Sequence, residues 1–318
     1  MKIAVIGAGG VGGYFGAKLA KAGFDVTFLA RGKHLMALLN KGLTVMSILG
    51  DFKVENLKAT DKITEIDKPD LIILGVKAWQ VNEIRDDINR ILHSGTMILP
   101  LQNGVLAATE LSQKIDKQKI LGGLCRIISK IESPGVINHF GITPTVVFGE
   151  LDRSKTERIF EVKKILETAG IESKISEDIE ADIWKKFISI CVSGLLAVTK
   201  TTYGELRELK ETRQLMIDLL TEIYLLSQKI GVNIESDFVK NTVSFIDSFP
   251  YDSTSSLTRD VWENKPSEIE YQNGTVVQLG EKYGIDTPIN RFVYDCILPN
   301  ELKARGKDLK TYSAQRLV

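Results

Sequence analysis

The chain has 318 residues, 43% of them hydrophobic, and carries 41 acidic and 41 basic side chains. This length predicts two domains, and the hydrophobic content is that of a protein with a full core. The balanced charge argues against a dedicated nucleic-acid-binding protein, which normally carries a basic excess. No apolar run is long enough to span a bilayer, and the N-terminus lacks a secretory signal pattern, so we expect a cytoplasmic protein that does not insert into membranes.

The three cysteines and three histidines are few and lie far apart in the sequence. No pair of them has the spacing of a disulfide framework or of a metal site. We therefore expect the cysteines to be small core residues and the histidines to lie in loops or on the surface. The sequence predicts no bound metal ion.

Short apolar runs alternate with helical patterns in the first half of the chain. We expect strands at 2–6, 25–29, 70–76, 96–99 and 171–175, helices at 10–23, 79–92 and 156–169, and a β-hairpin within 120–150. Strands that alternate with helices predict a parallel sheet with crossover helices. Continuous apolar runs are typical of strands covered on both faces. The expected fold class is α/β, with an N-terminal Rossmann-like doubly wound parallel sheet.

The pattern becomes wholly helical from about residue 178. We expect helices at 178–198, 205–230, 235–247, 267–283 and 287–303, with glycines and prolines near their ends. This change predicts a dinucleotide-binding domain over residues 1–176 and an all-helical substrate domain over residues 177–318. The apolar faces of the long helices suit either the core or a homodimer interface, so the oligomeric state stays open.

A glycine-rich segment follows the first expected strand and begins the first expected helix. In this pattern the first glycine permits a tight turn, the second lets the backbone approach a pyrophosphate, and the third lets helix and strand pack closely. The helix N-terminus adds unpaired N–H groups and a partial positive charge. The predicted dinucleotide-binding residues are Gly7, Ala8, Gly9, Gly10, Val11 and Gly12. The alternative is a glycine-rich turn without a ligand.

The choice of dinucleotide depends on the residues after the second expected strand. An acidic residue there would bind the ribose 2′-hydroxyl of NAD, but the sequence instead has Arg31, with Lys33 close by. A guanidinium pairs with a phosphate through two hydrogen bonds. Arg31 therefore favours NADP(H), and the alternative is an ordinary surface arginine in a loop.

Polar residues also follow the third and fourth expected strands. Lys77 and Asn103 lie at the carboxyl ends of these strands, where open α/β sheets bind ligands. Lys77 is placed to reach a cofactor phosphate, and Asn103 to hydrogen-bond the nicotinamide ribose or the substrate. A helix-capping loop at Lys77 and an Asn-Gly turn at Asn103 are the structural alternatives.

A helix of the second domain carries a candidate proton donor. Lys186, Ile190 and Gly194 are spaced by four residues and therefore share one expected helix face. A lysine near a cleft between two domains, with a pKa lowered by partial burial, can protonate a developing alkoxide. By residue type alone, solvated side chains at Lys185 and Lys186 are the commoner case.

Together these residues resemble the ketopantoate reductase (2-dehydropantoate 2-reductase) family. The resemblance spans nearly the whole chain in the family's order. The matching segments are residues 7–12, Arg31, and residues 77–80, 103–104, 184–186, 203–206, 267–270 and 273–274. The resemblance implies that Lys186 is the catalytic lysine, which gives a proton to the ketone oxygen. It also implies that Asn103 touches cofactor and substrate, and that Arg31 and Lys77 lie near the adenosine phosphate.

The resemblance extends to the substrate pocket, where this sequence departs from the family pattern. Glu268 falls on an acidic residue that closes over the cofactor, and Ser256 on a substrate-contacting serine of a Ser-Ser pair. Asparagines are usual in the family where this sequence has Ile190, Gly194 and Ser253. Each hydrogen bond lost to a polar substrate costs about 0.5–1.5 kcal/mol. With the glycine expected to leave volume, these positions predict a more apolar pocket.

The leading interpretation is an NADP(H)-dependent oxidoreductase that reduces a small 2-oxo acid. The resemblance implies 2-dehydropantoate as the substrate and pantoate as the product, in pantothenate and coenzyme A biosynthesis. One alternative is a related reductase for a different, more apolar 2-oxo acid. Another is an NADP-sensing protein that has lost catalysis, against which Lys186 and Glu268 argue because a sensor needs no proton donor.

Overall fold

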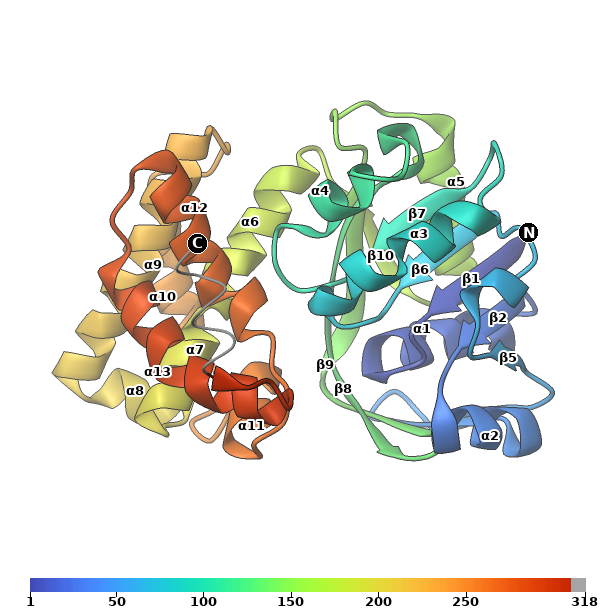
Figure 1. Cartoon of the computed structure of the whole chain (residues 1–318), viewed down its shortest axis with the longest axis horizontal. Helices are drawn as coiled ribbons and strands as arrows, with labels where there is room; N and C mark the ends of the chain where they lie inside the picture. The colour runs from blue at the N-terminus through green and yellow to red at the C-terminus, as the bar shows by residue number, and fades with distance from the viewer. Residues whose placement is uncertain (310–318) are drawn as a thin grey trace. The chain divides into compact units, whose positions relative to one another are not determined.

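The computed structural model describes residues 1–309 and divides the chain into two compact units (Figure 1). The first unit is Met1–Ile183, and the second begins at Trp184. Helix α6 (Ile179–Ile190) runs through this division. The domain boundary expected between residues 176 and 177 lies just before the same helix.

The first unit contains an all-parallel sheet of five strands in the order β5-β2-β1-β6-β7. The strands are β1 (Lys2–Ile6), β2 (Asp25–Leu29), β5 (Lys58–Thr60), β6 (Leu71–Leu74) and β7 (Met97–Pro100). Both β6 and β7 are buried along their whole length, as parallel strands covered on both faces require. The predicted doubly wound α/β fold is confirmed.

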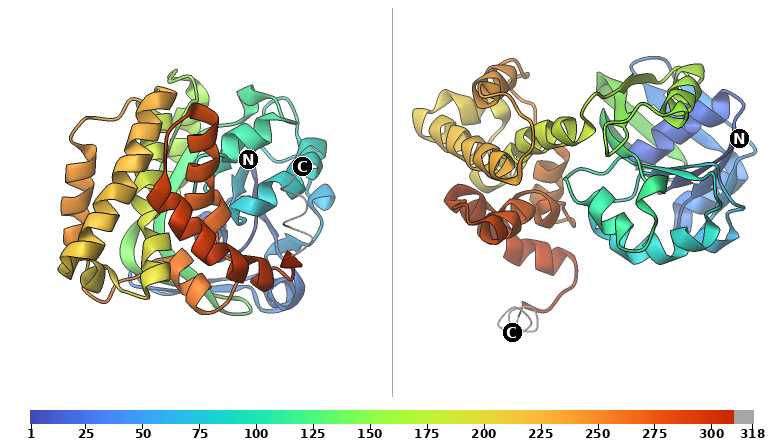
Figure 2. Two further views of the ribbon diagram at one scale, coloured as in Figure 1. Left: turned by 60° about the vertical axis from the view of Figure 1, so that its left-hand side comes forward. Right: turned by 90° about the horizontal axis from the view of Figure 1, so that it is seen from above.

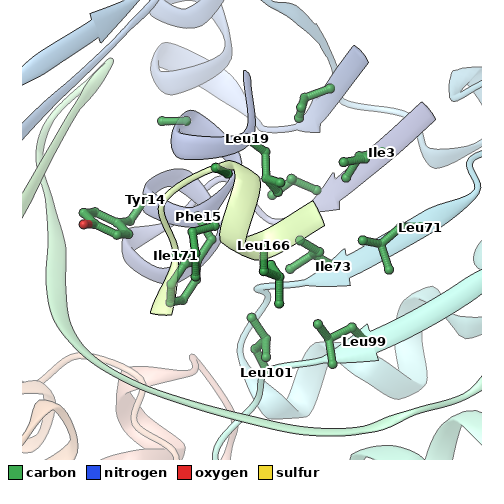
Figure 3. Close-up of a cluster of buried hydrophobic side chains, with 14 of the residues drawn as sticks. Ile3, Tyr14, Phe15, Leu19, Leu71, Ile73, Leu99, Leu101, Leu166 and Ile171 are labelled. Atoms are coloured by element: carbon green, nitrogen blue, oxygen red, sulfur yellow. The ribbon is translucent and has the colours of Figure 1, made fainter. Parts of the chain in front are cut away.

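Alternate residues of these strands face opposite sides of the sheet, and each side has its own core. On one side, α1 (Gly10–Lys21) and α5 (Glu157–Thr168) pack against the sheet (Figure 3). The buried residues of this core include Ile3, Phe15, Leu19, Leu71, Ile73, Leu99 and Leu166. On the other side lie α3 (Val81–Ile91) and α4 (Ala107–Ser112). Because both faces are covered, a ligand of this sheet has to bind at the strand ends.

A second sheet in the same unit has the order β10-β9-β3-β4, with β8 paired to β9. Its strands are β3 (Leu43–Ser47), β4 (Phe52–Val54), β8 (Gly122–Ser133), β9 (Val136–Gly149) and β10 (Glu172–Ile175). The expected hairpin is formed by β8 and β9, which are antiparallel and joined at Gly135 with a φ of +81°. The expected last strand is β10, which pairs parallel to β9 and not with the first sheet.

Several short elements were not predicted from the sequence. They are α2 (Gly32–Lys41), β3, β4, β5, α4 and the 3-10 turns η1 (Ile63–Glu65) and η3 (Lys117–Lys119). Strands β4 and β5 have only three residues each, which is too short for a clear periodic signal. The helix expected at 79–92 begins with a 3-10 turn, η2 (Ala78–Gln80), and continues as α3.

The described residues of the second unit form helices joined by turns and loops, with no strand among them, as predicted (Figure 2). After α6 come α7 (Val192–Thr199), α8 (Tyr203–Glu208), α9 (Lys210–Ile230), α10 (Phe238–Asp247), α11 (Ser256–Trp262), the 3-10 turn η4 (Ile269–Tyr271), α12 (Asn273–Tyr283) and α13 (Pro288–Ala304). The helix expected at 178–198 is interrupted at Cys191, and the one at 205–230 at Leu209. Helix α11 was not predicted. No helix within residues 1–309 is long and apolar enough to cross a membrane.

Two expectations about the cysteines and histidines were wrong. Cys296 is exposed on α13, whereas the other two cysteines are buried. His139 is buried in β9 and does not lie in a loop or on the surface. Its Nε2 donates to the Ile142 carbonyl at 2.8 Å, and its Nδ1 accepts the Ser47 hydroxyl at 2.8 Å. Because both ring nitrogens are hydrogen-bonded, the ring is accommodated inside the sheet.

Candidate active site

The candidate site begins at the carboxyl edge of the first sheet, where the strand order reverses. From β1 the sheet extends to β2 and β5 on one side and to β6 and β7 on the other. Loops that leave neighbouring strands in opposite directions mark the place where open α/β sheets bind ligands. The glycine-rich residues 7–12 follow β1 at this point, and Gly75, Val76 and Lys77 follow β6.

The glycines of residues 7–12 differ in what surrounds them. Gly7 has a φ of +100°, and a Cβ atom there would lie 2.7 Å from the backbone nitrogen of Val76. A Cβ atom on Gly12 would collide with the carbonyl oxygen of Gly7. No described atom outside its immediate neighbours lies within 4 Å of the Cβ position of Gly9. Packing therefore requires the first and third glycines, while the second faces open space.

Helix α1 begins at this open position with an uncapped N-terminus. Gly9 is the N-cap residue, no side chain caps the helix, and no acidic residue stands in its first turn. The Gly13 N–H donates to the Gly9 carbonyl at 2.7 Å. The N–H groups before it have no acceptor within the helix, and the helix dipole adds partial positive charge. The turn is therefore suited to an anion such as a pyrophosphate.

The end of β2 presents an unengaged cation. The Ala30 N–H donates to the Thr60 carbonyl at 3.0 Å, which ties this loop to β5. Arg31 is the N-cap residue of α2, and its exposed side chain makes no hydrogen bond or ion pair with any residue of the described chain. The first turn of α2 contains no acidic residue. The guanidinium is thus free to receive an anionic ligand.

Lys77 and Asn103 lie at the carboxyl ends of β6 and β7, and both are half-buried. Lys77 Nζ lies 5.8 Å from the centroid of the Trp79 ring, and the Lys77 N–H donates to the Gln80 side chain at 3.2 Å. Asn103 precedes Gly104, whose φ is +98°. The capping loop and the Asn-Gly turn considered as alternatives are therefore both present. Neither removes its side chain from the carboxyl edge.

Gln102 belongs to the same edge, although the sequence did not reveal its role. Its side chain is only 7% exposed. Its Nε2 donates to the carbonyl of Leu74 at 3.0 Å and to that of Val76 at 3.1 Å. The side chain thus links the end of β7 to the segment after β6. The only signal in the sequence was its position between a buried strand and Asn103.

In the second unit, α6 holds the two neighbouring lysines differently. Lys185 forms an ion pair with Glu235, with 2.6 Å between Nζ and Oε2. The hydrogen bond from Lys185 lowers the pKa of the Glu235 carboxyl. Lys186 is half-buried and lies about 100° further around the helix. The two lysine side chains therefore leave the helix in different directions.

The expectation that Gly194 leaves free volume was wrong. Gly194 is buried on α7, whereas Ile190 is the half-buried last residue of α6. A Cβ atom on Gly194 would collide with the side-chain amide oxygen of Asn273 and lie 2.6 Å from Cγ1 of Val293. Neighbouring helices fill the space, so this glycine is explained by packing.

Asn273 connects the junction of α6 and α7 to the rest of the helical unit. Its Nδ2 donates to the Cys191 carbonyl at 3.2 Å and to Asn290 Oδ1 at 2.9 Å. Asn290 Nδ2 in turn donates to Glu222 Oε2 at 2.7 Å. All three side chains are buried. This network holds the helix break at Cys191, five residues after Lys186.

The two serines of the Ser-Ser pair differ in what their hydroxyls do. Ser255 caps α11 by accepting the Thr258 N–H at 3.1 Å. Ser256 is exposed, and its hydroxyl makes no hydrogen bond with any described residue. Ser253 donates to the Pro250 carbonyl at 2.6 Å. Of these three serines, Ser256 is therefore the one whose hydroxyl remains available to a substrate.

Glu268 is buried and follows Ser267, which is held by several hydrogen bonds. The Glu301 carboxylate accepts the Ser267 N–H at 2.9 Å and the Ser267 hydroxyl at 2.6 Å. Arg305 neutralises this carboxylate at 2.5 Å and also donates to the Ser267 carbonyl at 2.9 Å. The end of α13 thereby fixes the backbone from which Glu268 extends.

Comparisons with known families match most of the chain. The family described as "Ketopantoate reductase PanE/ApbA" matches residues 3–153. The family described as "Ketopantoate reductase PanE/ApbA C terminal" matches residues 178–301. Both parts of the chain, the one with the sheets and the helical one, are therefore matched in the same order.

Individual relatives and a solved structure agree with this assignment. The chain is 31% identical over 297 residues to "Uncharacterized oxidoreductase YkpB" of Bacillus subtilis, covering 92% of this chain and 97% of that protein. It is 28% identical to a 2-dehydropantoate 2-reductase of Nostoc sp., covering 90% and 91% of the two chains. A PanE/ApbA family ketopantoate reductase from Ralstonia eutropha JMP134 matches with a TM-score of 0.88 and 27% identity, covering 96% and 100%.

Proposed function

Because the chain belongs to the ketopantoate reductase family of pyridine-nucleotide-dependent oxidoreductases, we propose that it reduces a small 2-oxo acid with NADPH. The proposed substrate is 2-dehydropantoate and the product pantoate, as in the relatives named 2-dehydropantoate 2-reductase. We assign nucleotide binding to residues 1–176 and the proton donor to residues 177–318.

The unengaged guanidinium of Arg31 is the observation that carries the choice of NADPH. It stands at the end of β2, beside which the adenosine ribose of a dinucleotide lies in this fold. A ribose 2′-phosphate would pair with it through charge-assisted hydrogen bonds. An aspartate at this position would instead repel the phosphate. The pyrophosphate is assigned to the uncapped start of α1 around Gly9, and Lys77 contributes positive charge nearby.

The proposed reaction adds a hydride to the carbonyl carbon and a proton to the carbonyl oxygen. NADPH, when bound, supplies the hydride. Lys186 gives its ammonium proton to the oxygen, so that the carbonyl becomes a hydroxyl and the lysine is left neutral. Asn103 and Ser256 orient the 2-oxo acid through hydrogen bonds. Glu268 is assigned the role of closing over the cofactor.

A second candidate is a related reductase for a more apolar 2-oxo acid. Ile190 favours it, because this half-buried apolar side chain lies one helical turn beyond Lys186 and offers no hydrogen bond to a substrate hydroxyl. With Gly194 assigned to packing, Ile190 is the remaining departure on this face. An NADP-sensing protein without catalysis is the third candidate.

The function is tested with a panel of 2-oxo acids assayed with NADPH and with NADH. We expect steady NADPH oxidation, with the highest kcat/KM for 2-dehydropantoate. Faster turnover of a 2-oxo acid without a hydroxyl group would favour the second candidate. NADPH binding without turnover of any 2-oxo acid would favour the sensor and overturn the proposal.

A further inference from the structure

Gln102 continues the pairing of β6 and β7 beyond the last bond between their backbones. The Leu101 N–H donates to the Leu74 carbonyl at 3.1 Å. Beyond this bond, Gln102 Nε2 donates to the Leu74 carbonyl at 3.0 Å and to the Val76 carbonyl at 3.1 Å. The side chain thus fixes the backbone after β6 at the point where the strands separate.

The same backbone segment is held from its other side by the glycine-rich residues. A Cβ atom on Gly7 would lie 2.7 Å from the Val76 nitrogen, and one on Gly75 would lie 2.8 Å from Cα of Gly12. Gly75 and Val76 are therefore packed against residues 7–12 on one side and hydrogen-bonded by Gln102 on the other. A change at Gln102 releases one of these two restraints.

The Gln102 side chain uses only the N–H groups of its amide for hydrogen bonding, and its amide oxygen makes this plain. Backbone carbonyls only accept, so the amide must present Nε2 to Leu74 and Val76. Its Oε1 is then left buried with no hydrogen-bond partner among residues 1–309. An unpaired buried acceptor destabilises the fold, and an apolar side chain of similar size would avoid that cost.

We propose that Gln102 is a positioning residue for the reduction, an inference that rests on the proposed function. Val76 precedes Lys77, and Gln102 precedes Asn103, so one amide sets the spacing between the two groups assigned to cofactor and substrate. Without it, the backbone beside Asn103 loses one of the restraints that set its distance from residues 7–12, which are assigned to the pyrophosphate. The nicotinamide end of the cofactor is then no longer aligned with the 2-oxo acid.

Gln102→Met tests this proposal, because methionine has a similar length and no N–H group. We expect kcat to fall about tenfold to a hundredfold, the scale of a misplacement of about 1 Å. The affinity for 2′,5′-ADP, which probes the Arg31 end, should stay within about twofold. With NADPH deuterated at the transferred position, the isotope effect on kcat should rise, because the chemical step becomes slower than product release. Gln118→Met, an exposed substitution of the same type, is the control.

Gln102→Glu provides a second variant if Gln102→Met folds poorly. Its carboxylate offers no donor to the two carbonyls, whereas the protonated carboxyl offers one. Its activity relative to the unaltered protein should therefore rise as the pH falls. A loss of kcat that only follows the folded fraction, with an unchanged isotope effect, would overturn the positioning role.

Failure of the proposed function is recognised separately, because the unaltered protein would then turn over no 2-oxo acid. In that case the fluorescence of bound NADPH decides the positioning role. Gln102→Met should change this fluorescence while leaving 2′,5′-ADP binding intact. Identical NADPH fluorescence and affinity in the two proteins would overturn the inference.

Discussion

The side-chain amide of Asn273 occupies the space that a side chain on residue 194 would need. Gly194 lies on α7 and Asn273 at the start of α12, and both are buried. The amide is held there by bonds to the Cys191 carbonyl and to Asn290. A glycine inside a helix costs about 1 kcal/mol relative to alanine. Here the close approach of two helices accounts for it.

Gly194→Asn should therefore destabilise the protein. Overpacking of a filled core typically costs about 1–3 kcal/mol, and we expect a decrease of this size in the free energy of unfolding measured with urea. Asn273→Ala removes the blocking amide, so the two substitutions together should cost less than the sum of their separate losses. Strict additivity, or a Gly194→Asn protein as stable as the unaltered one, would contradict the packing explanation.

Arg31→Ala should remove most of the preference for NADPH. Charge-assisted hydrogen bonds contribute about 1.5–3 kcal/mol, so the ratio of kcat/KM for NADPH to that for NADH should fall about tenfold to a hundredfold. Lys41→Ala, an exposed substitution at the other end of α2, is the control and should leave the ratio unchanged. If the unaltered protein uses NADPH and NADH equally well, Arg31 does not bind a 2′-phosphate.

The two lysines of α6 should respond differently to substitution. Loss of the proton donor in Lys186→Ala should lower kcat by about 10²–10⁴, while NADPH binding changes little. Lys185→Ala removes a partly exposed ion pair with Glu235, which contributes at most about 1 kcal/mol to stability. Glu235→Gln should reproduce the mild effect of Lys185→Ala. Equal losses of kcat in the two lysine variants would refute the assignment to Lys186.

Ile190→Asn should shift the substrate preference toward 2-dehydropantoate. An amide one turn beyond Lys186 can bind the substrate hydroxyl, and a neutral hydrogen bond contributes about 0.5–1.5 kcal/mol. The ratio of kcat/KM for 2-dehydropantoate to that for its analogue without the hydroxyl should rise about twofold to tenfold. Ile190→Val keeps the position apolar and serves as the control. An unchanged ratio in Ile190→Asn would show that this side chain does not face the substrate.

Much of the first unit follows from local signals in the sequence. Apolar runs and helical periodicity were sufficient for β1, α1, β2, β6 and β7, because each signal is contained in one segment. The tight turn at Gly7 was also predictable, since only glycine adopts its backbone conformation without strain. The sequence also showed directly that a basic residue, Arg31, and not an acidic one follows β2.

Only the tertiary structure decided which residues from distant segments meet. The amide of Gln102 reaches the carbonyls of Leu74 and Val76, and Asn273 fills the space beside Gly194. The break between α6 and α7 belongs with these contacts, because the Asn273 amide donates to the Cys191 carbonyl, which also accepts the Gly194 N–H. Such contacts depend on the path of the whole chain and leave no periodic trace in either segment. For that reason the sequence predicted an open pocket at Gly194, where the packed helices leave no room.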